Sequence, residues 1–579
     1  MLDFAKKSRI RILAIATLVL MAVFVSRLFY MQIIQHDYYI DLARKEQTKQ
    51  FDLPAERGEI YVMDSNGKPK KIVLNEVIYT VFADPKIVEN TDKVASVVRR
   101  VAGGTTVSDI EARLAKKESR YQIIATKITR AQAEMIKKER LVGVGFQRGT
   151  RRVYPEGQLA SQVLGFVNDE GKGQYGVEGK LDDRLKGADG KLVTVTDVRD
   201  IPLTVGKENI HQPAKNGQNI ALSIDRNVQA FTEKAIADGM KRTGADLVSA
   251  VVMDPNTGQV LAMANTPSYR PDQVSKVADV ALFNNTTISE PYEPASVFKT
   301  FTMSAALEKG VITPTTTYVN TDYTKVQDRT IQNATKGQTG KIDMQRVLTW
   351  SLNTGTVQIA RWLGDGQSIT YGARQTIYDY FHNKFRLDQK TGIELAGEAG
   401  GLMLSPDDPD GNDVRYSNMT FGQGLDVTMI QVATGFCSVV NGGSYYAPTV
   451  VAGSVDNDGN FSASKPRLVA SGIISESTSS TMRGMLVNAR RAFYAARDRA
   501  GYQIGGKTGT SQGIIDGQYS FKQQTASYIG FGGTDKPSYV VMVRVFGKEK
   551  AYDGGKDAQP IFTDISNKMI DYLKLQPKG

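Results

Sequence analysis

The first pattern in the chain is a run of apolar residues close to the N-terminus. Residues 12–25 carry no charge, and apolar residues resume after Arg27. A membrane-spanning helix needs about 20 residues, so we expect one such helix over residues 12–34, with the Arg27 side chain extended toward the interface. A cleaved signal peptide is the alternative, but Phe24 and Leu20 stand where its cleavage site would need small residues.

Basic residues lie on the N-terminal side of this apolar run, namely Lys6, Lys7, Arg9 and Arg11. Because positive charge is retained on the cytoplasmic side of a membrane, we expect residues 1–11 to form a cytoplasmic tail. The chain after about residue 35 then lies outside. The predicted location is the cell (inner) membrane, crossed once.

Residues 35–215 show patterns of short strands and turns rather than those of a compact enzyme core. Residues 57–61 lead into Asp64-Ser65-Asn66-Gly67, which is typical of a β-hairpin turn. Glycine is frequent between Gly165 and Gly190, as expected for loops and short strands. We therefore predict an elongated mixed α/β pedestal domain over residues 35–215.

From residue 216 onward the pattern becomes that of a larger domain. Apolar residues at helical spacing follow Asp225, a suitable N-cap, and an amphipathic helix with Ile561 and Ile565 closes the chain. Four strands are expected, at residues 247–253, 259–264, 528–531 and 539–546. For residues 216–579 we predict an α+β fold: an antiparallel sheet with strands from both ends of the domain, flanked by helices, and a long helical insertion as a second lobe.

Composition removes several classes of function. The chain has 579 residues, too many for one core, and 72 basic against 61 acidic residues, which suits a membrane surface or an acidic polymer. No basic block is interleaved with aromatic residues, so we expect no nucleic-acid partner. The chain has one cysteine, Cys437, and three histidines that lie far apart in the sequence, His36, His211 and His382. This composition predicts no metal site and no cofactor, and it leaves few candidate bases for a Ser-His-Asp triad.

Three short motifs supply candidate chemistry, in the order Ser296–Lys299, Ser351–Asn353 and Lys507–Thr510. Each motif alone is weak, and copies occur at Ser65–Lys68, Ser462–Lys465 and Lys390–Gly392. The Ser296 copy differs because it opens an apolar helical run that ends at Gly310. The non-catalytic interpretation is that the serine is a helix cap and the lysine a solvated charge. Three motifs in this order favour a reactive site instead.

The spacing of these residues has a chemical purpose. Residues i and i+3 share one face of a helix, so the Lys299 amine can reach the Ser296 hydroxyl. Burial and a neighbouring cation such as Lys507 would lower the pKa of Lys299 and make it a base. Ser296 at a helix N-terminus suits an oxyanion. Lys507-Thr508-Gly509-Thr510, preceded by Gly505-Gly506, predicts an edge strand whose missing side chains let a substrate backbone lie close against it, and its cation and two hydroxyls suit a carboxylate.

At this point the sequence resembles the class B penicillin-binding proteins, the single-span D,D-transpeptidases that cross-link peptidoglycan. The resemblance covers nearly the whole chain. The family usually has Gly where Ala295 stands and often Ser where Leu352 stands, and neither change removes a reactive group. The matching residues are Arg57–Ile60, Asn66-Gly67, Tyr154-Pro155, Gly165, Gly176–Glu178, Asp225, Gln229, Met253–Pro255, Thr257-Gly258, Glu293–Ser296, Thr391-Gly392 and Phe421–Gly424.

The resemblance implies a penicillin-binding/serine β-lactamase-like transpeptidase fold after a dimerisation-like pedestal, and it implies a role for each motif residue. Ser296 is the nucleophile toward the D-Ala–D-Ala carbonyl of a stem peptide, and Lys299 is the general base. Ser351 relays a proton to the leaving amine, with Asn353 and Lys507 nearby. The N–H groups of Ser296 and Thr510 form the oxyanion hole, and Thr508, Gly509 and Thr510 bind the substrate carboxylate. β-Lactams would acylate Ser296.

Related activities remain alternatives. A class A β-lactamase needs a glutamate after the second motif, but residues 354–393 contain none. A sensor or a bifunctional synthase lacks support in the sequence. A D,D-carboxypeptidase that hydrolyses the same acyl-enzyme is harder to exclude, and a non-catalytic cell-wall scaffold would not need the complete motifs.

Within the family, Glu293 and Asn353 resemble the FtsI-like septal enzymes, whereas many elongation enzymes have Ser-x-Asp in the second motif. The resemblance therefore favours a role in cell division over one in cell shape. It also implies a membrane-embedded glycan polymerase of the SEDS type as a partner, contacted through the anchor and residues 35–215, together with other cell-wall synthesis proteins.

Overall fold

The computed structural model describes residues 2–195, 210–515, 518–548 and 550–577. The chain divides into two compact units. One comprises Met1–Arg57 and Lys186–Gly217, and the other Gly58–Leu185 and Gln218–Gly579.

The first unit begins with the predicted apolar helix. Helix α1 (Leu2–Phe29) continues through a π-helical turn, Tyr30–Ile34, and is followed by α2 (His36–Gln47). The stretch Ile10–Ile34 is long and apolar enough to cross a membrane, and none of it is buried inside the protein. At 1.5 Å per residue its 25 residues span about 37 Å, more than the ~30 Å hydrocarbon core. Strands β1 (Thr48–Leu53), β8 (Gly190–Val195) and β9 (Ile210–Gln212) complete this unit as a three-stranded sheet.

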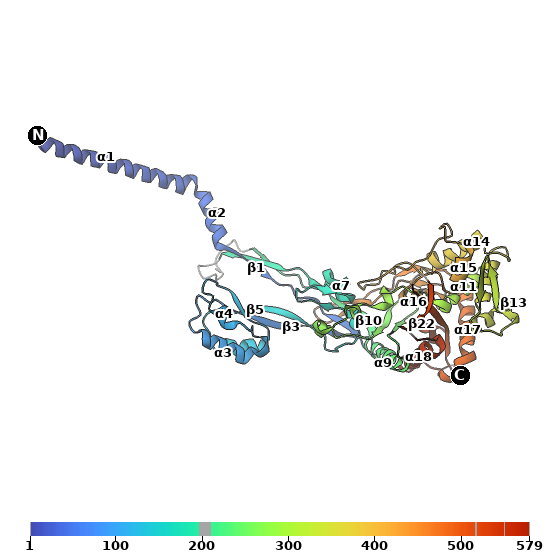
Figure 1. The fold of residues 1–579 in the computed structure, drawn as a ribbon. Coiled ribbons are helices and arrows are strands. Elements are labelled where there is room, and N and C mark those ends of the chain that lie inside the picture. Colours follow the sequence, from blue (N-terminus) through green and yellow to red (C-terminus); the bar gives the residue numbers. More distant parts are fainter. Residues whose placement is uncertain (1, 196–209, 516–517, 549, 578–579) are drawn as a thin grey trace. The chain divides into compact units, whose positions relative to one another are not determined.

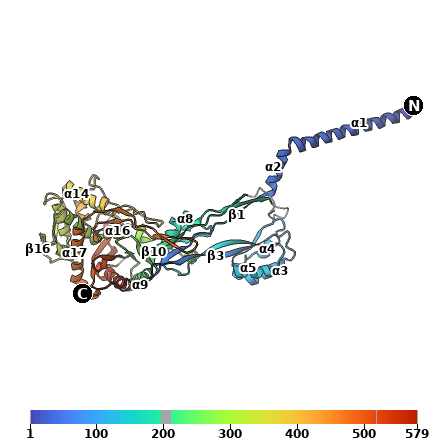
Figure 2. The same ribbon diagram turned by 180° about the vertical axis from the view of Figure 1, so that it is seen from behind.

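The second unit opens with the predicted β-hairpin. Strand β2 (Ile60–Met63) pairs antiparallel with β3 (Pro69–Ala83), and the turn is held by the Asp64 carboxylate, which accepts hydrogen bonds from the backbone N–H groups of Asn66 and Lys68. Gly67 supplies the positive φ that this turn requires, +69°. The long β3 also pairs with β4 (Gln122–Thr129) and β5 (Val144–Val153). Figures 1 and 2 show α3 (Thr91–Ala102) and α4 (Ile110–Leu114) beside these strands, and Figure 2 labels α5 (Arg130–Lys138) with them.

A buried ion pair ties together distant parts of this region. The Arg152 guanidinium donates to the Glu178 carboxylate (2.7 Å), to the Asn75 side chain (2.7 Å) and to the Gly58 carbonyl (2.6 Å). The Glu178 side chain is fully buried, so its charge requires this partner. Gly58 and Glu178 are thus parts of one junction, although they are far apart in sequence.

One strand extends this sheet in a way that the sequence did not predict. Strand β10 (Asn219–Asp225) runs parallel to β2 and antiparallel to β18 (Val451–Val455), so three remote segments share one sheet. Its central side chains are buried on both faces, and polar Ser223 interrupts the apolar run that would have revealed a strand.

The predicted antiparallel sheet is confirmed in the part of the chain after residue 216. Its order is β12 (Val260–Thr266), β11 (Leu247–Met253), β23 (Pro537–Lys548), β22 (Gln518–Gly533) and β21 (Gln503–Ile515). Helices α9 (Arg226–Thr243) and α18 (Gln559–Tyr572) lie side by side on one face in both ribbon views (Figures 1 and 2). Asp225 caps α9 as predicted and also accepts a hydrogen bond from the Tyr572 hydroxyl (2.7 Å).

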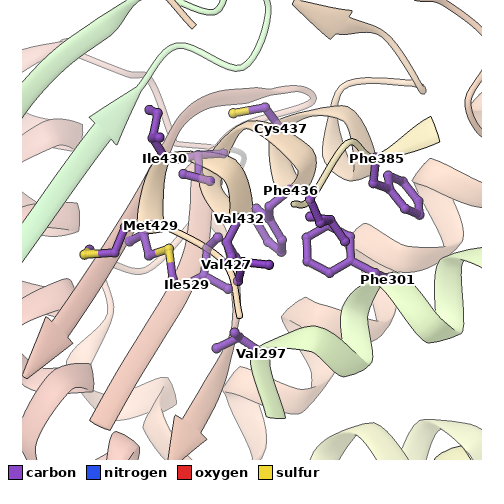
Figure 3. Close-up of a cluster of buried hydrophobic side chains, with 14 of the residues drawn as sticks. Val297, Phe301, Phe385, Val427, Met429, Ile430, Val432, Phe436, Cys437 and Ile529 are labelled. Carbon is purple, nitrogen blue, oxygen red and sulfur yellow. The ribbon is translucent and has the colours of Figure 1, made fainter. Parts of the chain in front are cut away.

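The other face of the sheet is covered by α16 (Met429–Val440), against which the helix that follows Ser296 packs. Helix α16 is buried along its whole length and packs against α11 (Lys299–Glu308) and β23. Figure 3 shows Phe436 and Val432 of α16 in one apolar cluster with Val297, Phe301 and Ile529. This cluster fixes the position of the Ser296 segment relative to the sheet.

The long insertion forms the second lobe. It contains α12 (Met344–Trp350), α13 (Asn353–Trp362), α14 (Tyr371–Tyr378) and α15 (Asp413–Met419). Two small two-stranded sheets accompany these helices, and the sequence did not predict them: β13 (Thr317–Asn320) with β16 (Gly340–Asp343), and β14 (Tyr323–Val326) with β15 (Arg329–Gln332).

Candidate active site

Ser296 lies in a tight helical turn that leads directly into α11. The turn spans Ala295–Phe298, and Ala295 has a left-handed backbone with φ +52°. A non-glycine residue in this region is strained, and here the Ala295 N–H is held by the Gly422 carbonyl (2.9 Å). The Glu293 carboxylate accepts a hydrogen bond from the Gly424 N–H (2.7 Å) and fixes the same loop. The strained turn leaves Ser296 half-buried at the start of the helix.

Lys299 is the centre of the site. Its side chain is fully buried, and its Nζ lies 3.1 Å from Ser296 Oγ and 3.1 Å from Ser351 Oγ. The same nitrogen lies 2.6 Å from the Ser351 carbonyl oxygen and 2.7 Å from Asn353 Oδ1. These last two oxygens can only accept. A neutral amine has two N–H groups, and these donate to the Ser351 carbonyl oxygen and to Asn353 Oδ1. Its lone pair is then left to accept a hydrogen bond from a serine hydroxyl.

Electrostatics favour that neutral amine. Burial lowers the pKa of Lys299 well below its usual value, and the charge of Lys507 lowers it further. Burial also lowers the pKa of Lys507, to about 7, against the opposing charge of Asp553. The predicted depression of the Lys299 pKa by burial and by Lys507 is therefore reproduced in the structure.

The second motif occupies the junction between two helices. Ser351 ends α12 in a left-handed conformation, φ +57°, and Asn353 begins α13. Leu352 between them is fully buried, which anchors the junction. The Asn353 side chain is held at both ends, because its Oδ1 accepts from Lys299 and its Nδ2 donates to the Gln332 carbonyl (2.9 Å).

The third motif lies on β21, which is an edge strand as predicted. A side chain at Gly509 would collide with Ser527 and with the Pro294 carbonyl (2.8 Å), so only glycine lets this strand pack on the loop before Ser296. Lys507 Nζ donates to the Thr508 carbonyl (3.0 Å), and Thr510 Oγ1 accepts from the Gly554 N–H (3.1 Å). Thr510 is exposed.

The expected role of Gly505-Gly506 is corrected by the structure. We expected these glycines to leave room for a substrate backbone. A side chain at Gly505 would instead meet Phe531 (2.6 Å), and one at Gly506 would meet Tyr528 (2.6 Å). Their missing side chains make room for internal aromatic rings of the same sheet.

A cavity of about 230 Å³ borders the second and third motifs. Ser351, Lys507 and Thr508 line it together with Asp553 and Thr335. Sequence reasoning missed these last two residues and Gln332. The dipeptide Gly554-Gly555 after the last strand was an available signal for Asp553, because a side chain at Gly554 would collide with β21.

The other candidate residues make structural contacts away from the three motifs. The second Lys-Thr-Gly copy is a turn in which the Glu398 carboxylate accepts from the N–H and hydroxyl of Thr391 (2.6 Å each). His382 contacts Asp388 (2.8 Å), and Cys437 is buried. Among the described residues, no group of His, Cys, Asp and Glu is arranged to hold a metal ion.

Comparison with known proteins gives the family. The penicillin binding protein transpeptidase domain matches residues 248–567, and the penicillin-binding protein dimerisation domain matches residues 52–222. Stage V sporulation protein D of Bacillus subtilis is 30% identical over 96% of this chain and 84% of its own length. Peptidoglycan D,D-transpeptidase FtsI of Escherichia coli is 26% identical over 98% of this chain and 92% of its own.

Solved structures agree. Penicillin-binding protein 3 of Mycobacterium tuberculosis, in complex with aztreonam, superposes with a TM-score of 0.68 at 25% identity, covering 91% of this chain and 98% of that chain. The N-terminal apolar helix supports a membrane location. The chain belongs to the class B penicillin-binding proteins, the serine-type D,D-transpeptidases of peptidoglycan synthesis.

Proposed function

We propose that this protein cross-links peptidoglycan stem peptides through an acyl-enzyme on Ser296, and that β-lactams acylate the same serine. The observation that carries the proposal is the buried Lys299 nitrogen, placed 3.1 Å from the hydroxyl oxygens of both Ser296 and Ser351. A neutral amine there can take a proton from one hydroxyl while the other hydroxyl is ready to give one.

In acylation, the Lys299 amine accepts the Ser296 proton as Oγ bonds to the carbonyl carbon of the penultimate D-Ala. The N–H groups of Ser296 and Thr510 stabilise the resulting oxyanion. Ser351, which lies beside the lysine, passes a proton to the leaving nitrogen, and its own proton is replaced from Lys299. The C–N bond breaks, the terminal D-Ala leaves, and an ester to Ser296 remains.

Lys507, Thr508 and Thr510 hold the terminal carboxylate in this proposal. Because the Thr510 oxygen already accepts from the Gly554 N–H, its own proton is free to point toward a ligand. Gly509 keeps this strand close to the loop before Ser296, so the carboxylate and the scissile carbonyl can be held together.

In the second half-reaction, the amine of another stem peptide attacks the ester. An amide forms, the ester C–O bond breaks, and the proton returns to Ser296. Water in place of the amine would make the protein a D,D-carboxypeptidase. Incubating the acyl-enzyme of a D-alanyl thioester with an amine acceptor separates the two, because transpeptidation yields an amide product and hydrolysis yields only the free acid.

We also propose a septal role and a single-span topology with the N-terminus in the cytoplasm. Similarity to FtsI of Escherichia coli and the Asn353 form of the second motif support the septal role. Basic residues before the apolar helix support the orientation. In this proposal a SEDS-type polymerase is a partner of the anchor and residues 35–215. Depletion in cells should give filaments, whereas rounded cells would indicate elongation.

The catalytic proposal is tested by labelling with a fluorescent penicillin. Wild-type protein should be labelled covalently, and Ser296→Ala should abolish the label. Ser65→Ala is the matched control, because Ser65 belongs to another Ser-x-x-Lys copy in a surface turn. Labelling that survives Ser296→Ala would refute the assignment, and an unlabelled wild type would favour a non-catalytic scaffold.

A further inference from the structure

A buried arginine interrupts the apolar face of strand β23. Val540, Met542 and Arg544 alternate along this strand and so point to the same side, where the first two belong to the core that also contains α16. Arg544 is only 5% exposed. A charge in such a place is costly unless it has partners, so the partners of Arg544 indicate its role.

These partners lie in the segment that leads to Ser296, residues 290–295, here called the Ser296 segment. The Arg544 guanidinium donates to the Glu290 carboxylate (3.2 Å), and its Cζ lies 4.4 Å from the centroid of the Tyr292 ring. The Tyr292 side chain is buried, and a cation over an aromatic face away from water is a favourable contact. Arg544 therefore holds two residues of the chain just before the nucleophile.

The same arginine belongs to a row of paired residues that crosses the sheet. Arg544 is paired with Ser249 of β11 on one side and with Ser527 of β22 on the other, and Ser527 is paired with Gly509 of β21. Residues paired in this way point to the same face of a sheet. Both serines are buried. The row leads from the arginine to the edge strand, where a side chain at Gly509 would collide with Ser527.

The Ser296 segment contacts both ends of this part of the row. Tyr292 lies on Arg544 of β23, and the Pro294 carbonyl would be 2.8 Å from a side chain at Gly509 of β21. The backbone N–H and carbonyl of Tyr292 are also both hydrogen-bonded to Val427 (3.0 Å each). The sheet therefore holds the segment at two points, one on β23 and one on β21.

These two contacts set the geometry of the oxyanion hole, a step that rests on the proposed function. Its two N–H groups come from Ser296, directly after this segment, and from Thr510, next to Gly509 on the edge strand. They stabilise an oxyanion only if both point at one atom, and a misplacement of about 1 Å can cost about 10²-fold in rate. Ala295, just before Ser296, has a strained backbone (φ +52°), which persists only where its surroundings hold it.

We propose that Arg544 is a positioning residue of the reaction. Through Tyr292 and Glu290 it holds the Ser296 segment against the sheet, at the distance from Thr510 that the oxyanion requires. Arg544 acts through this segment and does not touch the substrate. Its loss should therefore slow the acylation step and leave the preceding binding of a ligand unchanged.

The test uses full-length protein in detergent and benzylpenicillin. Acylation rates at increasing penicillin concentration give the dissociation constant of the first complex and the rate constant of acylation. Arg544→Met replaces the guanidinium by an apolar side chain. The Glu290 carboxylate that loses its partner is 46% exposed and stays hydrated, so the melting temperature should fall by no more than about 4 °C. The acylation rate constant should fall about 10- to 100-fold, and the dissociation constant should change by less than about twofold.

Arg483→Met is the matched control. Arg483 is also an arginine with little exposure that pairs with an exposed glutamate, Glu476, but it lies on α17 (Glu476–Tyr494). Its acylation rate constant should stay within about twofold of that of the wild type.

Variants of the Ser296 segment assign the effect to the contact. Tyr292→Leu removes the ring that faces Arg544. If the two residues act as one unit, the double variant Arg544→Met/Tyr292→Leu should react within about twofold of the slower single variant. Glu290→Gln changes an exposed side chain and should slow acylation about two- to fivefold, so it remains informative if a buried variant does not fold.

The results separate this proposal from the proposed function. The positioning role is wrong if penicillin acylates Ser296 of the wild type and Arg544→Met reacts equally fast, loses only affinity, or is slower only because less of it is folded. It is also wrong if the double variant multiplies the two single losses. In each of these cases the proposed function stands. If penicillin does not acylate the wild type, the proposed function itself fails.

Discussion

At the scale of single residues, the site depends on where one proton sits. Lys299 has four oxygens within 3.1 Å of its nitrogen, and two of them can only accept. Burial removes the solvation that an ammonium requires. The arrangement therefore stabilises a neutral amine whose lone pair faces a serine hydroxyl, which is the form a general base needs.

The role of Ser351 gives a direct prediction. Ser351→Ala removes the hydroxyl at 3.1 Å from Lys299 but keeps the backbone carbonyl at 2.6 Å. Loss of a positioned proton donor should slow acylation by benzylpenicillin by about 10²- to 10⁴-fold, measured as the second-order rate constant. A variant that retains the wild-type rate would show that the leaving nitrogen receives its proton elsewhere.

Asp553 predicts a change in pH dependence. The cationic form of Lys507, which binds a carboxylate in our proposal, predominates below its pKa of about 7, and Asp553 raises that pKa. Asp553→Asn removes the charge while keeping an oxygen for the N–H groups of Gly555 and Lys556. The pKa of Lys507 should fall further, so the alkaline limb of acylation should move to lower pH.

The measurement for Asp553→Asn is the penicillin acylation rate across pH. The charge of Lys507 also lowers the pKa of Lys299, so the protonation states of the two lysines are linked. Asp557→Asn serves as the control, because Asp557 accepts from the Asp553 N–H but is not among the charges acting on Lys507. A limb that stays in place, or that moves to higher pH, would contradict the assignment.

At the scale of elements, local patterns predicted the parts that carry a long apolar run or apolar residues at helical spacing, even where both faces are buried. In β11, Val248, Ala250 and Val252 pack under α9 and α18, whereas Val251 and Met253 face the opposite core. Helix α9 was recognisable from its Asp225 cap and its apolar spacing, and α18 from its apolar spacing alone. Strand β10 was missed because polar Ser223 interrupts its apolar run, and the small two-stranded sheets were missed because four-residue strands carry little periodicity.

Arg490 on α17 (Glu476–Tyr494) shows how a helix is joined to the sheet. Its buried guanidinium donates to Asp498 through two nitrogens (2.6 and 2.8 Å) and to the Tyr528 hydroxyl of β22 (2.7 Å). Asp498→Ala should lower the free energy of unfolding by about 3–5 kcal/mol, since it strands a buried charge. Arg499→Ala, which breaks an exposed pair with Asp571, should cost at most about 1 kcal/mol.

Thermal unfolding measured by circular dichroism tests this pair of variants. The Asp498→Ala melting temperature should fall clearly below that of the wild type, while Arg499→Ala stays close to it. Equal effects of the two variants would mean that the buried pair contributes no more than a surface one.

At the scale of the whole molecule, the three motifs come together because each one lies at the end of a helix or on the edge strand of the sheet. Ser296 starts a helix, Ser351 and Asn353 join two helices, and Lys507 lies on a sheet edge. Their spacing along the sequence was therefore enough to predict them. Asp553 was not predicted, because it reaches its place through the loop that follows β23, and no periodic pattern marks such a contact.

The apolar helix predicts how the whole protein partitions. Its apolar side chains over Ile10–Ile34 are not buried inside the described structure, so they require an apolar surrounding. The full-length protein should sediment with membranes and resist extraction by salt. A variant that lacks residues 2–34 should be soluble and should keep penicillin acylation within about twofold, because no residue of that segment borders the site. A deletion variant that still sediments with membranes would point to a second attachment.

The central claim is that a neutral Lys299 activates the Ser296 hydroxyl. Mass spectrometry of the intact protein after incubation with benzylpenicillin, followed by peptide mapping, tests it most directly. A β-lactam ring opens without losing a fragment, so we predict a mass increase of one whole penicillin, located on the peptide that contains Ser296 and absent from Lys299→Ala. An unmodified wild type, an adduct on another residue, or full modification of the Lys299→Ala variant would contradict the account.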